Sequence, residues 1–154
     1  MTWREVDFEK KIWTIPFERA KNSRAHFVHL APRAIEIIQA QPKTDGLVFP
    51  TASGKPFSEF SIMKSRLDQE SGVSDWVLHD LRRTVVSGMA SLGTAPHVAD
   101  KVLNHQSGII SGVAAVYQRH EFLAERKVAM EIWDGHVASL FRPKSSKLVQ
   151  VPQN

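Results

Sequence analysis

Cysteine is absent from the 154 residues, and tyrosine occurs once, at position 117. Without cysteine the chain cannot form disulfides, use a thiolate nucleophile or bind zinc through sulfur. No apolar run approaches the roughly 18 residues that a membrane-spanning helix needs, and residues 1–7 lack the apolar segment of a signal peptide. We therefore expect a cytoplasmic protein with no membrane partner.

The charge is unbalanced in favour of Lys and Arg, with 20 of them against 16 Asp and Glu, which gives a formal charge of +4. Such an excess suits an anionic partner such as a nucleic acid, although many proteins carry it without binding one. A chain of 154 residues with 42% hydrophobic content is long enough for one domain with a core and too short for two ordinary ones.

The N-terminal part of the chain has the pattern of a β-hairpin. Two β-prone runs, at 12–15 and 26–30, flank a polar and basic segment that contains Lys21 and Arg24. We expect the two runs to pair as antiparallel strands, with the basic segment as an exposed turn between them.

Apolar residues at helical spacing dominate the rest of the chain, so the sequence predicts a mixed α+β fold, mostly helical, with a small N-terminal antiparallel sheet. The expected helices run from Pro32 to before Pro42, from an N-cap at Ser58 to Gly72, from a cap at Asp80 to Gly93, from Thr94 onward, and over Glu121–Leu140. Their expected inner faces include Phe60, Met63 and Leu67 in the second helix and Phe122, Ala129, Trp133, Val137 and Leu140 in the last. We expect residues 1–142 to form the domain and 143–154, polar and without periodicity, to form a flexible tail.

A first chemical motif lies at the start of the third expected helix. His79 and Arg82 are three positions apart, so both side chains and the free amides of the helix start can converge on an anion. A histidine and an arginine at a helix start are often only a cap and a solvated charge, so this motif alone is of moderate specificity.

Two further boxes follow in order, namely 103–106 (LNHQ) and 116–119 (VYQR), with Tyr117 twelve positions after His105. The order resembles that of the tyrosine recombinases, or phage-type integrases. Their catalytic domains carry a His-x-x-Arg box, a Leu-Gly-His-like box and a tyrosine nucleophile in a Tyr-x-Arg setting at comparable spacing. Asn104 stands where many members have glycine, and it looks like the variant found in phage- and island-type integrases.

The hairpin region resembles the same family, whose catalytic lysine falls on Lys21, and the resemblance extends from Trp3 to about Leu140. The family's first active-site arginine lies in a helix just before the segment matched by Trp3–Asp7, and on this resemblance we expect both that helix and the family's DNA-clamping domain to be missing. The resemblance therefore implies a fragment, whether engineered, read from an internal start codon or left by a truncated gene. We expect it to be nearly inactive alone, because an arginine at a phosphoryl transition state is worth about 10³ to 10⁵ in rate.

The resemblance also implies a mechanism without metal or other cofactor. Tyr117 attacks phosphorus, which gives a phosphotyrosyl bond to DNA and a free 5′ hydroxyl. Arg82 binds two phosphate oxygens at once, and His79 and His105 donate further hydrogen bonds. Lys21 protonates the leaving oxygen.

Double-stranded DNA is the implied partner, with backbone phosphate contacts from Arg24, Arg83 and Arg119, although ordinary surface charge accounts for these arginines nearly as well. Family members pass a C-terminal segment to a neighbouring protomer, so the resemblance leaves open whether the chain forms a homo-oligomer on DNA. His26 and His29 are three apart on a strand and point to opposite faces, so we expect no metal pair there.

Several alternatives remain at this point. Tyr117 could be a half-buried core residue, and His105 could serve only to cap its helix. The chain could also be a noncatalytic DNA-binding remnant, or a metal-free phosphatase or phosphodiesterase that uses His79 and Arg82.

Overall fold

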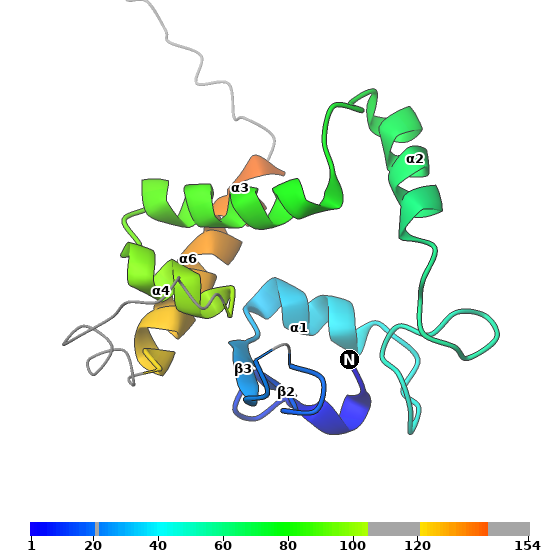
Figure 1. The fold of residues 1–154 in the computed structure, drawn as a ribbon, viewed down its shortest axis with the longest axis horizontal. Helices are drawn as coiled ribbons and strands as arrows, with labels where there is room; N and C mark the ends of the chain where they lie inside the picture. The colour runs from blue at the N-terminus through cyan, green and yellow to red at the C-terminus, as the bar shows by residue number, and fades with distance from the viewer. Residues whose placement is uncertain (21, 105–120, 142–154) are drawn as a thin grey trace, which may run out of the picture.

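The computed structural model describes residues 1–20, 22–104 and 121–141. After a short 3-10 helix, η1 (Trp3–Glu5), three strands form one antiparallel sheet in the order β1-β2-β3 (Figure 1). The strands are β1 (Val6–Asp7), β2 (Ile12–Ile15) and β3 (His26–His29). With five described helices besides this sheet, the predicted α+β class is confirmed.

The predicted hairpin is confirmed as β2 and β3, which pair in the register Ile12 with His29 and Ile15 with His26. β-Branched and aromatic residues favour these strands because their side chains pack well on a pleated surface. The predicted second strand was one residue too long, because Leu30 follows β3 and is buried beneath the sheet.

The sheet packs against α1 (Pro32–Gln39), which begins at a proline as predicted and ends before Pro42. Together they enclose the first of two core clusters, which we call the sheet cluster. Its buried members are Leu30, Ile38 and Val48, and half-buried residues around them are Met1, Trp3, Val6, Phe8, Trp13, Ala34 and Ile35.

Three helices, α3 (Leu78–Ser91), α4 (Pro96–Val102) and α6 (Leu123–Leu140), pack on one another to form the second cluster, which we call the helical cluster. It is built from Met89, Val98, Ala99 and Ala129, with Trp133 and other half-buried residues around them. Where α3 meets α6, Gly88 lies directly against the Trp133 ring, so the missing side chain permits the close approach.

Helix α2 (Phe60–Ser71) stands apart from both clusters (Figure 1). The predicted end at Gly72 is confirmed, with φ of 70° at that glycine, but the N-cap is Glu59 rather than Ser58. The prediction of an inner face was wrong, since Phe60, Met63 and Leu67 are 49%, 37% and 42% exposed. The helix spacing of these residues is real, but no other described element covers them.

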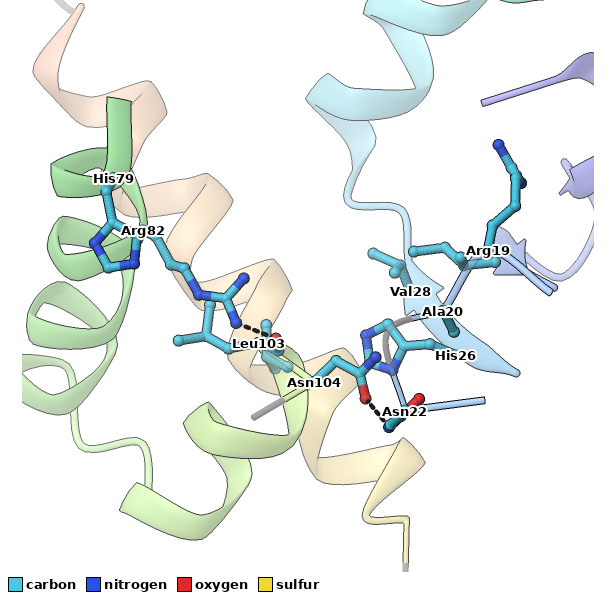
Figure 2. A pocket seen from close by; sticks show the side chains of 11 residues that line it. Arg19, Ala20, Asn22, His26, Val28, His79, Arg82, Leu103 and Asn104 are labelled. Atoms are coloured by element: carbon cyan, nitrogen blue, oxygen red, sulfur yellow. Dashed lines mark hydrogen bonds between the residues drawn. The ribbon is translucent and has the colours of Figure 1, made fainter. Parts of the chain in front are cut away.

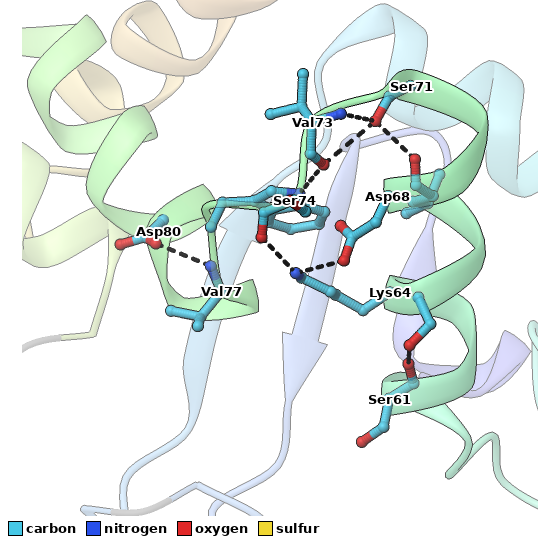
Figure 3. Close-up of polar contacts among 11 residues, drawn as sticks. Ser61, Lys64, Asp68, Ser71, Val73, Ser74, Val77 and Asp80 are labelled. Atoms are coloured by element: carbon cyan, nitrogen blue, oxygen red, sulfur yellow. Dashed lines mark hydrogen bonds and ion pairs between the residues drawn. The ribbon is translucent and has the colours of Figure 1, made fainter.

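A lysine joins α2 to the loop that follows it (Figure 3). The Lys64 ammonium lies 2.6 Å from Asp68 Oδ2, donates to the Ser74 carbonyl over 2.9 Å, and lies 5.2 Å from the centre of the Trp76 ring. These contacts direct the chain from α2 toward the start of α3.

The remaining differences concern helix ends. Asp80 is the third residue of α3 and not its cap, and its carboxylate accepts a hydrogen bond from the Val77 amide over 2.9 Å. Helix α4 begins at Pro96 rather than Thr94, because a proline fits the first helical turn. In α6 the buried residues are Arg126 and Ala129, whereas Leu140, predicted to face inward, is 68% exposed.

Polar contacts connect β3 to α6 and so join the two clusters. The buried guanidinium of Arg126 donates to the carbonyl of Phe27, and His29 Nε2 lies 3.3 Å from Glu131 Oε1.

The predicted tail, 143–154, lies outside the described residues. Within the described ranges no helix is long and apolar enough to cross a membrane.

Candidate functional site

A cavity of about 740 Å³ opens where the sheet meets the helical cluster (Figure 2). Its walls come from β2, β3 and the segment between them on one side, and from α3 and the end of α4 on the other. The lining residues are Ile15, Arg19, Ala20, Asn22, His26, Val28, His79, Arg82, Val102, Leu103 and Asn104.

The two residues of the His-x-x-Arg motif both line this cavity. They lie three positions apart in the first two turns of α3, so their side chains emerge on the same face of the helix. His79 is exposed and Arg82 is half-buried, which leaves the imidazole open to a ligand while the guanidinium lies deeper.

The Arg82 side chain extends from α3 toward the end of α4, where it donates a hydrogen bond to the carbonyl of Leu103 (Figure 2). The last carbonyls of a helix have no partner within the helix, so they accept readily from such a cation. This contact keeps the guanidinium in the cavity wall.

On the opposite wall, the amide of Asn22 reaches across to α4. Asn22 Nδ2 donates to Asn104 Oδ1 over 2.9 Å, between residues that are 82 positions apart in sequence. Figure 2 shows this bond beside His26, at the far side of the cavity from His79.

His26 is buried, with only 6% of its surface exposed, and lies at the base of this wall. Burial lowers the pKa of its imidazole, the charge of Arg126 lowers it further, and a hydrogen bond with the backbone of Val102 partly opposes both effects. The hydrogen bond with Val102 joins β3 to the last turn of α4.

Four predicted functional residues lie outside the described residues: Lys21, His105, Tyr117 and Arg119. Lys21 immediately precedes Asn22 in sequence, and His105 immediately follows Asn104.

Two of the arginines predicted to contact DNA, Arg24 and Arg83, are among the described residues, and neither lines the cavity. Arg24 is exposed. Arg83 is also exposed, and its guanidinium lies 3.3 Å from Asp80 Oδ1 on a different side of α3 from Arg82. Their positions leave both arginines accessible to a large anionic partner.

Sequence reasoning missed Asn22, His26 and Asn104 as cavity residues. The sequence did contain a signal for His26. It lies two positions before Val28, another cavity residue, and residues two apart on a strand share a face. For Asn22 and Asn104 the sequence offered only their adjacency to Lys21 and His105.

The arrangement is suited to binding an oxyanion. Arginine and histidine donors converge on one cavity, and charge-assisted hydrogen bonds from such groups are the strongest that phosphate oxygens receive. Among the described residues no group of three His, Asp or Glu side chains could hold a metal ion, and His26 and His29 have separate partners.

Comparison with known proteins identifies the family of this chain. The sequence model of the phage integrase family matches residues 1–122. Prophage integrase IntA of Escherichia coli K12 is 26% identical over 136 residues, which are 85% of this chain and 32% of the relative. Prophage integrase IntZ of the same strain is 26% identical over 151 residues, 95% of this chain and 37% of the relative.

The chain thus spans about a third of the length of the curated relatives it matches. No solved structure matches it significantly. Since the family model covers most of the sequence, the chain belongs to the phage integrase family.

Proposed function

We propose that this chain is part of the catalytic domain of a tyrosine recombinase, which cuts and rejoins double-stranded DNA at specific sites. Residues 1–142 would belong to that domain, and Tyr117 would be the nucleophile. Family membership supports the reaction class. The observation that carries the proposal is the cavity that His79 and Arg82 line together with Asn22 and Asn104.

The cavity offers what a phosphodiester needs for attack without a metal. The negative charge of the phosphate repels nucleophiles, so positioned cations and donors must neutralise its nonbridging oxygens. Arg82 supplies a planar pair of donors and His79 supplies another from the same helix face. His105, the residue after Asn104, would add a third.

In the proposed reaction the phenolic oxygen of Tyr117 forms a bond to phosphorus while the bond from phosphorus to the 5′ oxygen breaks. The phenolic proton passes to His79, and the 5′ oxygen takes a proton from Lys21. Because the phosphotyrosyl bond retains the energy of the broken one, a 5′ hydroxyl of another strand can reverse the step and join the strands. Arg24, Arg83 and Arg119 would hold backbone phosphates around the site.

A suicide substrate tests the proposal. We suggest a pool of end-labelled duplexes of random sequence, each with a nick beside the potential scissile phosphate, so that the short released strand diffuses away and traps the covalent complex. The wild-type chain should give a labelled protein band on a denaturing gel after long incubation. Tyr117→Phe should give none, and Arg82→Ala should reduce the yield at least about a hundredfold.

The other outcomes identify the alternatives. Binding of the same duplexes that weakens with salt, with no covalent band from the wild type, would show a noncatalytic DNA-binding remnant. Turnover of small phosphate esters that survives in Tyr117→Phe would show a phosphatase or phosphodiesterase. Either result would overturn the recombinase proposal.

A further inference from the structure

Two asparagines face each other across the cavity, and each is the sequence neighbour of a proposed catalytic residue. Asn22 follows Lys21, and Asn104 precedes His105. Their side chains are joined by a half-buried hydrogen bond of 2.9 Å from Asn22 Nδ2 to Asn104 Oδ1. The bond therefore connects the segment between β2 and β3 to the end of α4. Its two partners are the sequence neighbours of the proposed acid, Lys21, and of the proposed phosphate donor, His105.

The amide of Asn22 has a defined orientation. Its Oδ1 accepts a hydrogen bond from the Arg24 backbone amide over 3.3 Å, so its Nδ2 is the group that faces Asn104. The side chain thus stabilises its own turn with one atom and reaches the helical cluster with the other.

Asn104 is held in a conformation that few residues adopt. Its φ is 53°, in the left-handed region, and its backbone amide donates to the Lys101 carbonyl over 3.2 Å. Asparagine and glycine tolerate this region, but of the two only asparagine can accept a hydrogen bond from Asn22.

We propose that Asn22 and Asn104 are a positioning pair: their hydrogen bond holds the segment between β2 and β3 to the end of α4 and, through the chain, restrains the sequence neighbours Lys21 and His105. The inference rests on the proposed function. Consecutive Cα atoms are about 3.8 Å apart, so fixing Asn22 and Asn104 restricts where the neighbouring backbones can lie. Neither asparagine touches the reacting atoms in this role, because each acts through its neighbour.

The functional test measures the single-turnover rate of covalent capture and the Kd for the same nicked duplexes. Asn22→Ala and Asn104→Gly each remove one partner, and the double variant removes both. A neutral hydrogen bond of this kind corresponds to a factor of about five, so each single variant should slow capture about fivefold with the Kd unchanged. The double variant should be no slower than the slower single variant, because both remove the same bond.

Ser23→Gly is the matched control. Ser23 also has a positive φ, 51°, and lies next to Asn22, but its side chain takes no part in the pair. Glycine at 23 adds the same backbone freedom as glycine at 104, so capture at the wild-type rate in Ser23→Gly would assign the effect to the lost hydrogen bond.

A second readout does not depend on catalysis. Amide hydrogen exchange is read on the side opposite each substitution: at Ser23 for Asn104→Gly, and at Asn104 for Asn22→Ala. Each protection factor should fall about fivefold. Asn104→Asp should keep the protection at Ser23, because its carboxylate can still accept from Asn22 Nδ2.

The two failures are distinguishable. If the wild type captures no DNA, the proposed function fails, and hydrogen exchange alone decides whether the pair couples the two segments. Unchanged exchange across the cavity overturns the pair. So does capture slowed additively in the double variant, or a raised Kd with an unchanged capture rate.

Discussion

His26 is a buried histidine, and its burial has a consequence for stability. Burial lowers its pKa below the ordinary value of 6.5, and the nearby charge of Arg126 acts in the same direction. Burial also lowers the pKa of His29, against the opposing effect of Glu131. Both imidazoles therefore resist protonation in the folded chain more than in the unfolded one.

We expect the two histidines to leave the free energy of unfolding undiminished above about pH 6.5. Below that pH, the free energy of unfolding should decrease as the pH falls. In that range the unfolded chain binds protons that the folded chain excludes, and the decrease levels off once the pH is below the lowered pKa values. Each histidine can contribute up to about 1.4 kcal/mol per pH unit. Urea denaturation at several pH values measures the slope.

His26→Gln and His29→Gln should each flatten this slope, even where they lower stability at neutral pH. The slope, rather than the absolute stability, is the diagnostic quantity, since any core substitution can destabilise. A slope in both variants equal to that of the wild type would show that other groups cause the pH dependence.

At the scale of helices, the contact between α3 and α6 depends on a glycine. A Cβ atom built on Gly88 overlaps the Trp133 ring, and the ring is packed into the helical cluster. We expect Gly88→Ala to lower the free energy of unfolding by about 1–3 kcal/mol, because overpacking outweighs the better helix propensity of alanine.

Gly135 in α6 is the matched control, since a Cβ atom there meets nothing within 4 Å. Gly135→Ala should raise the free energy of unfolding by about 0.5–1 kcal/mol, because alanine loses less backbone entropy in a helix. Thermal or urea unfolding of both variants decides the matter, and equal effects at 88 and 135 would contradict the described crossing.

Helix α2 depends on local contacts, three of which involve Lys64 (Figure 3). We expect Lys64→Met to lower the local stability of α2 by about 1–2 kcal/mol, because it removes an ion pair, a hydrogen bond to the loop and a cation–π contact. Arg66→Met removes an exposed pair with Glu70 at the same i,i+4 spacing and should cost at most about 0.5 kcal/mol. Amide exchange in α2 separates the two, and equal exchange would contradict a special role for Lys64.

The elements that sequence predicted well are those with local causes. The β-branched run of β2, Pro32 at the start of α1 and Gly72 after α2 each act on their own backbone. The exposed face of α2 could not be predicted, because its apolar spacing does not specify which element, if any, covers it. Most of the cavity could not be predicted from sequence either, since the contact of Asn22 with Asn104 joins positions 82 residues apart.

At the scale of the whole chain, a single arginine makes a main connection between the two clusters. Arg126 is 3% exposed and donates from α6 to the carbonyls of Phe27 and Glu121. We expect Arg126→Met to lower the free energy of unfolding by about 1–3 kcal/mol, because the Phe27 carbonyl loses its charged donor at this junction. Arg126→Lys should recover part of this free energy, since an ammonium still donates hydrogen bonds. It should not recover all of it, because an ammonium lacks the planar fork that serves two acceptors.

The same change should also divide the unfolding transition. In the wild type we expect amides of β2 and of α3 to exchange through one common opening, whereas in Arg126→Met the sheet should open at lower free energy than the helices. Lys127→Met, which removes a neighbouring exposed charge, controls for charge alone and should leave a single opening. Identical opening in all three proteins would contradict this role of Arg126.

The hydrogen bond from Arg82 to the Leu103 carbonyl has one more consequence. An oxyanion that takes this guanidinium must compete with the protein's own backbone, so ligand affinity and the conformation of the final α4 turn are thermodynamically linked. Linkage is reciprocal: an anion that draws Arg82 away weakens its hold on that turn, and release of Arg82 from the turn favours anion binding.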